Sequence, residues 1–476
     1  MWRGNAIIGK NILNKYERER QMLLKKAVLF AGALCLVIGT SAVSFAENSV
    51  VDSASKYLNN NVKISGYGSY EFEEVEVGNN SGTPVNHYWS HQVFAGIGFM
   101  AALNPQIELV AGVEGKMWNP FPNTALPGHT QFTTQYSFDF TSAYGSYSPF
   151  GGTDNSWLDI TAGYFPYKYN PDVRNLGEYV FRTLTYPGLI FNGFDFPANR
   201  LLGLKLHANI ADDFFGKIDS KLKSDLMITE EDQNWPMGDI SVSWLGSLNI
   251  KKVVEIGAGV DFANCISVNG FNTTPQDNTN IQVVSQDALG KNIYDSTSYY
   301  TFQATKLMAR INIDPKQIWG YDGQLFGQED LKLYGEACII GVKNYPFYYD
   351  NLGQRTPIML GFNVPAFKIL DLLNVEVEYY SSPLSTTYQN QSLPQTTNDK
   401  IFCIPVPGSI LPPVPDYLRY KWSVYVKKSL TSRVSCVLQV AHDHYRLYYA
   451  DGAPVLTESL SDQGDWRWVF KFVGNL

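Results

Sequence analysis

The sequence contains long segments in which apolar and polar residues alternate, and the charged residues of each segment occupy every second position. In 62–73, VKISGYGSYEFE, apolar and glycine residues alternate with lysine, serine, tyrosine and glutamate. Segment 465–473, DWRWVFKFV, repeats the pattern, with tryptophan and phenylalanine alternating with Arg467 and Lys471. Successive side chains of a β-strand point to opposite faces of the sheet, so each segment has one apolar and one polar face. The chain must therefore form a sheet whose two sides meet different surroundings.

The same pattern predicts about sixteen strands. With this even number, the N-terminus and the C-terminus of the chain lie on the same side of the membrane. The Asn104-Pro105 dipeptide marks a tight turn between two of them. The predicted strands are 62–73, 89–103, 106–118, 133–147, 157–165, 201–210, 217–229, 238–248, 252–263, 299–313, 329–342, 356–364, 374–380, 417–427, 432–448 and 465–473.

The connections between these strands alternate in length. Every second one is mostly long, as in 166–199, 264–298 and 381–416, and the others are mostly short, with 314–328 as an exception. Long loops at one end and short turns at the other are typical of outer-membrane barrels. We therefore predict an all-β fold, a transmembrane antiparallel up-and-down β-barrel with long extracellular loops and short periplasmic turns. The competing class is a secreted β-sandwich or β-solenoid, which has no reason to separate its loops by side.

The segregated charges indicate a water-filled lumen. A basic side chain that faces lipid near the bilayer midplane costs about 2–4 kcal/mol, and sixteen strands enclose a space too wide for side chains alone to fill. The residues that we expect to face this lumen are Lys205, Lys221, Lys223, Lys306, Arg310, Glu336, Glu376, Glu378, Arg419 and Lys421.

The N-terminal region carries an export signal. In 22–46 a basic start is followed by an apolar core and by Ser44-Phe45-Ala46, a small-x-small cleavage site, which predicts a secretory signal peptide. Residues 1–21 then form an upstream extension ahead of Met22, 47–61 a short periplasmic segment, and 62–476 a single barrel domain. The predicted location is the bacterial outer membrane.

Composition excludes several functional classes. Asp and Glu number 45 against 37 Lys and Arg, so the chain lacks the basic surface that a nucleic-acid partner calls for. The cysteines have no metal-binding spacing, and no nucleophile motif of the GxSxG type is present. His442 and His444 share one face of a strand while Asp443 points the other way, which is a poor metal site. We predict no catalytic residues, no metal site and no cofactor.

With its signal peptide, the Gly66-Tyr67-Gly68 motif in the first strand and an aromatic last strand, the chain resembles the bacterial outer-membrane porins. It departs from them at the end, since it continues past Phe472 to Leu476. The resemblance implies that the third long loop folds inward as a constriction, that the barrel-assembly machinery inserts the chain into outer-membrane lipid, and that a homotrimer forms.

The loop 166–199 is the candidate constriction. Arg174, Glu178 and Arg182 are spaced i, i+4, i+8, so a helix would stack them on one face, with Asp172 close by. We predict a porin, a non-enzymatic passive channel for small hydrophilic solutes or ions. The acidic total favours cations, while the aromatic residues of this loop would suit stacking against sugars. The alternative is a non-conducting barrel that serves adhesion or envelope structure.

Overall fold

The fold is known from a computed structural model of the chain. It describes residues 62–80, 83–119, 134–150, 156–181, 199–212, 219–230, 240–266, 282–286, 292–295, 304–319, 325–342, 352–380, 396–397, 400–401, 420–445, 447, 459–460 and 462–475.

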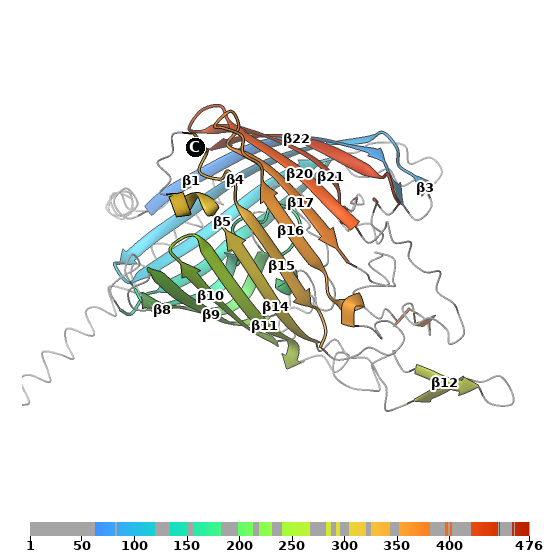
Figure 1. Cartoon of the computed structure of the whole chain (residues 1–476), viewed down its shortest axis with the longest axis horizontal. Coiled ribbons are helices and arrows are strands. Elements are labelled where there is room, and N and C mark those ends of the chain that lie inside the picture. The colour runs from blue at the N-terminus through green and yellow to red at the C-terminus, as the bar shows by residue number, and fades with distance from the viewer. Residues whose placement is uncertain are drawn as a thin grey trace, which may run out of the picture.

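Sixteen strands form one closed barrel in which every strand is antiparallel to both neighbours and β1 pairs with β22 (Figure 1). Their bounds are β1 Val62–Val77, β4 Tyr88–Asn104, β5 Ile107–Trp118, β6 Gln135–Tyr147, β7 Leu158–Tyr167, β8 Asn199–Asp212, β9 Ser220–Glu230, β10 Ile240–Ile250, β11 Val254–Ile266, β14 Ala304–Ile313, β15 Leu333–Ile339, β16 Ile358–Asn363, β17 Leu372–Tyr379, β20 Tyr420–Ser429, β21 Val434–His442 and β22 Trp466–Asn475.

The predicted fold class is confirmed, because each of the sixteen predicted segments overlaps one barrel strand. The largest difference in length is at β21, which was predicted to end at residue 448 and ends at His442. β15 was predicted to begin at residue 329 and begins at Leu333. Leu331 has φ of 63°, and the Asp330 carboxylate accepts hydrogen bonds from the backbone N–H groups of Gly327 and Phe367 at 2.8 and 3.2 Å. This turn holds the chain out of the sheet until Leu333.

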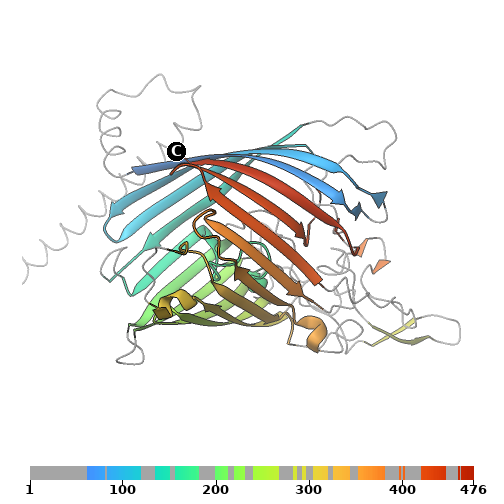
Figure 2. The same ribbon diagram turned by 45° about the horizontal axis from the view of Figure 1, so that its top comes forward.

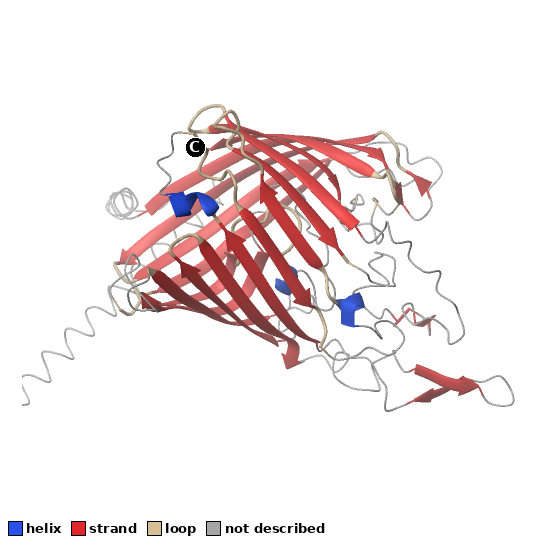
Figure 3. Cartoon of the chain, viewed as in Figure 1, coloured by secondary structure: helices blue, strands red, loops and turns tan. Residues whose placement is uncertain are grey.

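The other regular elements lie in the connections. Three two-stranded sheets pair β2 (Asn79–Asn80) with β3 (Thr83–Pro84), β12 (Gln282–Gln286) with β13 (Asn292–Asp295), and β18 (Thr396–Thr397) with β19 (Lys400–Ile401). Helix in the described part of the chain is confined to the short 3-10 segments η1 (Tyr179–Phe181), η4 (Pro315–Trp319) and η5 (Leu352–Arg355) (Figure 3). No helix among the described residues is long and apolar enough to cross a membrane.

The two ends of the barrel have connections of different length. β4 and β5 meet in a tight turn, where the Asn104 side chain accepts hydrogen bonds from the N–H groups of Gln106 and Ile107, both at 2.8 Å. The strand pairs β7–β8, β11–β14 and β17–β20 are joined by much longer segments at the opposite end. Figures 1 and 2 show the C-terminus at the end with short turns, away from the β12–β13 sheet.

The barrel wall separates apolar from polar side chains. On β14, Leu307 and Ile311 are exposed on the outside, whereas the intervening Met308 and Arg310 are buried inside. On β22, Phe470 and Phe472 are exposed, and Arg467 between the outward Trp466 and Trp468 is buried. A register slip by one residue would exchange the two faces, so this pattern fixes the pairing of the strands.

A pair of glycines marks the strands that carry the inward loop. Gly163 on β7 pairs with Gly203 on β8, and their φ angles are 124° and 154°. A Cβ atom at Gly163 would lie 2.3 Å from the Ala143 carbonyl oxygen, and one at Gly203 would lie 2.1 Å from that of Ile228. Only glycine fits at these two close approaches of backbone to backbone.

Candidate functional site

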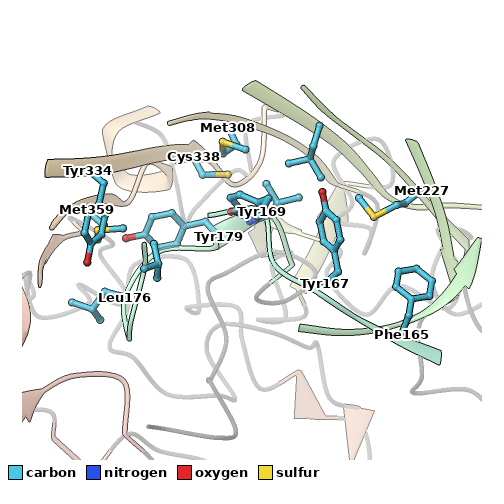
Figure 4. Packing of buried hydrophobic residues seen from close by; sticks show 13 residues of the cluster. Phe165, Tyr167, Tyr169, Leu176, Tyr179, Met227, Met308, Tyr334, Cys338 and Met359 are labelled. Atoms are coloured by element: carbon cyan, nitrogen blue, oxygen red, sulfur yellow. Dashed lines mark hydrogen bonds between the residues drawn. The ribbon is translucent and has the colours of Figure 1, made fainter. Parts of the chain in front are cut away.

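The segment Lys168–Phe181, which follows β7, lies inside the barrel; we call it the inner loop. Val173, Leu176 and Tyr179 of this loop are fully buried. They pack against inward side chains of the wall, including Met308 on β14 and Met359 on β16 (Figure 4). The apolar wall residues of this cluster come from β7, β9, β10, β14, β15 and β16, so the inner loop follows one side of the wall.

Glu376 on β17 fixes the middle of the inner loop. Three successive backbone N–H groups, those of Arg174, Asn175 and Leu176, donate to its carboxylate at 2.5 to 2.8 Å. The Tyr334 hydroxyl donates a fourth hydrogen bond at 2.6 Å. Hydrogen bonds to an ionised acceptor are about twice as strong as neutral ones, so this carboxylate both satisfies the loop backbone and holds it to the wall.

Glu336 on β15 fixes the next turn of the loop in the same way. The N–H groups of Glu178 and Tyr179 donate to its two oxygens at 3.0 and 2.9 Å, and the Tyr169 hydroxyl donates at 2.5 Å. Burial raises the pKa of the Tyr169 hydroxyl well above its usual value, and the charge of Glu336 raises it further. The tyrosine therefore stays a hydrogen-bond donor to this carboxylate.

Two further wall residues hold the end of the loop. Lys306 on β14 donates from Nζ to the Val180 carbonyl oxygen at 2.8 Å, and the Tyr179 hydroxyl donates to Glu378 on β17 at 2.8 Å. Four of the charged residues predicted to line an open lumen, Lys306, Glu336, Glu376 and Glu378, are thus covered by the inner loop and are at most 3 % exposed.

The tip of the inner loop carries an ion-pair network near the short-turn end. Lys332 lies 3.2 Å from an oxygen of Asp172 and 2.9 Å from one of Glu329, and Arg174 lies 3.4 Å from Glu329. Burial lowers the pKa of Lys332, but the carboxylates of Asp172 and Glu329 outweigh it, so that the pKa is raised.

These groups line a polar cavity of about 360 Å³. Its other lining residues include residues of the β10–β11 turn, of β11 and β14, and of the connection that contains η4.

The predicted helical ladder of Arg174, Glu178 and Arg182 is wrong for its described members. Arg174 points to Glu329, whereas Glu178 is fully buried and accepts hydrogen bonds from the Asn170 N–H at 2.5 Å and from the Asn199 side chain at 3.3 Å. Gly177 and Glu178 have φ of 93° and 59°, which no right-handed helix contains. Arg182 lies outside the described residues.

A second segment enters the barrel after β21. Asp443 accepts two hydrogen bonds from the Arg467 guanidinium at 2.8 and 3.1 Å, and Arg467 also donates to Glu73 on β1 at 2.6 Å. Burial raises the pKa of Asp443, but the charge and hydrogen bonds of Arg467 lower it more, so that the pKa lies below its usual value. The Asn175 side chain donates to Asp443 at 2.8 Å and connects this segment to the inner loop.

Each member of the His442-Asp443-His444 trio has a different partner. Nδ1 of His442 lies 2.8 Å from the Asp465 carbonyl oxygen, and Nε2 of His444 lies 2.5 Å from Glu378. Asp443 faces Arg467. The three side chains tie this segment to three parts of the wall and share no common centre.

The remaining predicted lumen charges divide into three groups. Lys221 and Lys223 are exposed on the inward parity of β9, which they share with Met227, while Lys205 lies 5.6 and 5.8 Å from the ring centres of Phe165 and Tyr167. Arg310 pairs with Glu255, and Lys421 donates to the Leu460 carbonyl oxygen at 2.7 Å. Arg419 lies outside the described residues.

The wall opposite the inner loop is polar. On β5, Glu114 accepts a hydrogen bond from Tyr67, and Lys116 lies 5.3 and 5.1 Å from the ring centres of Phe94 and Trp118. The interior therefore has one side covered by the inner loop and another that presents charged and hydroxyl groups.

Sequence reasoning found the charged wall residues but missed what they hold. The anchoring by Glu336 and Glu376 joins residues 157 to 202 positions apart in the chain. A local signal was the high content of tyrosine and phenylalanine in 166–199, a segment predicted as a loop.

No family model matches the sequence, and a search of curated proteins found no match. The fold is similar to that of solved structures at 8–10 % sequence identity.

A high-pH structure of OprB from Pseudomonas putida matches with a TM-score of 0.47, 10 % identity and coverage of 89 % of this chain and 96 % of that one. OmpF from Salmonella typhi in complex with daunomycin matches with a TM-score of 0.44 and 10 % identity, over 88 % and 99 % of the two chains. A triple mutant of the Rhodopseudomonas blastica porin matches with a TM-score of 0.40 and 8 % identity, over 87 % and 100 %. The strand order and pairing of this chain are themselves those of a closed β-barrel of sixteen antiparallel strands.

Proposed function

We propose that this protein is an outer-membrane porin, a passive diffusion channel for small hydrophilic solutes or ions, exported by the signal peptide at 22–46. The closed sheet leaves no unpaired strand edge, and its outer face is apolar, which suits a wall in lipid. The inner face carries the charges, which suits contact with water.

The observation that carries the proposal is the one-sided attachment of the inner loop. Glu336, Glu376 and Lys306 hold it along β14, β15 and β17, while the inner face of β5 opposite keeps its charged side chains. A loop that narrows a barrel without filling it would be attached in this way. In this proposal the inner loop forms the constriction, and Asp172 and Arg174 stand at its tip beside the polar cavity.

A specific contact favours the alternative, a non-conducting barrel for adhesion or envelope structure. The hydrogen bond from Asn175 to Asp443 joins the inner loop to a second inward segment, and His444 binds Glu378 at 2.5 Å. Two connected inward segments would suit a barrel that is closed from within.

Single-channel recording decides between the two. The chain without residues 1–46 would be refolded in detergent and checked for β-structure by circular dichroism. It would then be added to a planar bilayer in about 1 M salt, where many ions carry the current and surface charges are screened within about 3 Å. Stepwise currents are expected from a porin. A folded barrel that inserts and stays silent would rule out the channel and support the closed barrel.

The role of the inner-loop tip is tested in the same recordings. Arg174→Ala removes the guanidinium at the cavity, and we expect a changed conductance and a changed reversal potential in a salt gradient. Arg433→Ala, at the exposed β20–β21 turn, is the matched control. Equal currents from both variants and the unsubstituted protein would show that the inner-loop tip does not form the constriction. That result would not contradict the proposal that the protein is a channel.

A further inference from the structure

Three metal-ligating side chains converge on the outer face of the barrel, away from the lumen. Glu74 and Glu76 belong to β1, and His87 directly precedes β4. One carboxylate oxygen from each glutamate and one ring nitrogen of His87 all lie within 4.8 Å of one another. The group lies where the chain passes from the barrel wall to the β1–β4 connection, at the end with the long loops.

The distances in this group match those between ligands of one ion. Nδ1 of His87 lies 3.5 Å from a Glu74 oxygen and 3.3 Å from a Glu76 oxygen. These separations exceed the 2.7–2.9 Å typical of a charge-assisted hydrogen bond. Two ligands of a tetrahedral zinc ion, with bonds of about 2.0–2.1 Å, lie about 3.3 Å apart. The spacing between His87 and the two carboxylates is therefore that of a metal site.

A neighbouring side chain orients one of the carboxylates. The Trp468 indole N–H donates to Oε1 of Glu76 at 2.9 Å, while Oε2 of the same carboxylate faces His87. Hydrogen bonds of this kind orient ligands in metal sites. Trp468 packs on Phe72 with ring centres 5.3 Å apart, and Phe72 in turn lies 6.4 Å from Trp89, so the indole is itself held in place.

The position of His87 is also fixed by the backbone. The His87 N–H donates to the Glu76 carbonyl oxygen at 3.3 Å, and Val85 next to it is 5 % exposed and packs with Val75, Leu447 and Leu460. The ligands therefore lie on a strand and on a packed connection, and little ordering is needed for an ion to bind. The 75 % exposed side chain of His87 leaves the group open to ions from solution.

We propose that Glu74, Glu76 and His87 form a binding site for a divalent transition-metal ion of the zinc type. Two carboxylates and one imidazole are a ligand set that zinc uses in sites with an open fourth position, and the imidazole disfavours calcium and magnesium, which take oxygen ligands. The site departs from the expectation that the chain has no metal ligands. It rests on the fold alone and does not depend on whether the barrel conducts.

Isothermal titration calorimetry with zinc chloride tests the site in the folded full-length protein in detergent. We expect one saturable site per chain. Glu74→Gln and His87→Ala should each abolish that site. His91→Ala removes another histidine of the same outer face, one that contacts Tyr70 at 2.6 Å, and should leave zinc binding unchanged.

Two further measurements distinguish the loss of the zinc site from a failure of the variant to fold. Trp468→Phe keeps the aromatic ring but removes the donor to Glu76, and should weaken zinc binding by about 10–100-fold. An equal concentration of calcium should not displace zinc. Unchanged zinc affinity in both folded ligand variants, or displacement by calcium, would overturn the proposal, and so would the absence of a saturable site in the unsubstituted protein.

Discussion

The side-chain amide of Asn175 donates a 2.8 Å hydrogen bond to the carboxylate of Asp443, 268 positions away in the chain. Asn175 belongs to the inner loop, and Asp443 begins the segment that follows β21. Because Arg467 binds the same carboxylate and also binds Glu73 on β1, this contact links the inner loop to the seam where the first and last strands close the barrel. One buried network thus holds both inward segments.

Asn175→Ala should loosen the inner loop without releasing it. The substitution removes one hydrogen bond to a buried carboxylate, and such bonds contribute about 1.5–3 kcal/mol. The backbone of residue 175 still binds Glu376. In single-channel recordings we expect noisier open currents, since one tether of the loop is lost, while urea unfolding shows the lower stability.

Ser423→Ala is a matched control for this change. It removes a buried hydrogen bond of 2.7 Å to Gln439 within the wall, away from the inner loop. It should lower the free energy of unfolding and leave the current noise unchanged. Equal noise from both variants would contradict the role of the Asn175–Asp443 contact in holding the loop.

Glu376→Gln should detach the middle of the inner loop. A glutamine amide has one acceptor oxygen, and its NH₂ group would face backbone N–H donors that now bind the carboxylate. An unsatisfied buried donor costs about 1–3 kcal/mol. We expect a loss of stability of at least about 2 kcal/mol, and faster backbone amide hydrogen exchange in 174–176.

The comparison for that variant is Glu108→Gln on β5, which lies across the barrel from the strands that hold the inner loop. It should change neither the exchange of residues 174–176 nor the free energy of unfolding by more than about 0.5 kcal/mol. If both variants leave the loop equally protected, Glu376 does not anchor it.

The alternating segments predicted the barrel because successive residues of a strand point to opposite faces of the sheet. Odd or even position in the strand therefore decides whether a side chain lies on the outer or the inner face of the barrel. Leu307 and Arg310 could be assigned to opposite faces from the sequence, and the strands that contain them follow. A one-residue shift would bury charges in the apolar face, so few pairings were open.

The inner loop could not be predicted in the same way. The i, i+4 spacing of Arg174 and Glu178 favours a helix by only about 0.2–0.5 kcal/mol. Glu336 and Glu376 accept five hydrogen bonds from this backbone and two more from tyrosine hydroxyls, and they lie more than 150 positions further along the chain. Such contacts exist only once the barrel has brought β15 and β17 beside the loop.

Asp443 should make the folded protein sensitive to acid. Its pKa is lower in the folded state than the value of 3.8 for an unperturbed aspartate, because Arg467 outweighs the effect of burial. A lowered folded-state pKa stabilises the protein above the unfolded-state pKa, and this contribution is lost as the pH falls through the folded-state value. The loss therefore begins near pH 4 and grows below it.

Denaturant unfolding at a series of pH values from about 7 down to about 2.5 measures this effect, because the series passes through the unfolded-state pKa of aspartate, about 3.9. Asp443→Asn should be less stable at pH 7, because Arg467 loses a charged partner, and its stability should fall less steeply below pH 4. Asp371→Asn, at an exposed position between β16 and β17, should keep the steep fall. An unchanged slope in Asp443→Asn would show that other carboxylates cause the acid sensitivity.

Lys221 and Lys223 should influence ion selectivity more than the covered wall charges. Both are exposed on the inward parity of β9, whereas Glu376 and Glu378 are fully buried beneath the inner loop. Charges that line a pore attract ions of opposite sign. Replacing both lysines by glutamate should shift the reversal potential in a salt gradient toward cation preference.

Replacing Lys251 and Lys428 by glutamate changes the net charge of the protein by the same amount near the short turns. This control separates the effect of charges that line the lumen from the effect of the protein's net charge. A shift of equal size in both double variants would assign selectivity to the overall charge of the protein and contradict a specific role for β9.

Leu226→Lys tests which solvent the outer face meets. Leu226 lies on the outward parity of β9, where it is 39 % exposed and pairs with Trp244 on β10. In a bilayer a lysine near the midplane costs about 2–4 kcal/mol, whereas the same change on a water-exposed strand costs little. Folding equilibria in phospholipid vesicles, followed by tryptophan fluorescence, measure the difference. Gln92→Lys puts the same charge on the inward parity of β4, opposite Glu71, and should change stability by less than about 1 kcal/mol. A small effect at Leu226 would mean that the apolar face of the barrel is not in contact with lipid, and the membrane location would have to be abandoned.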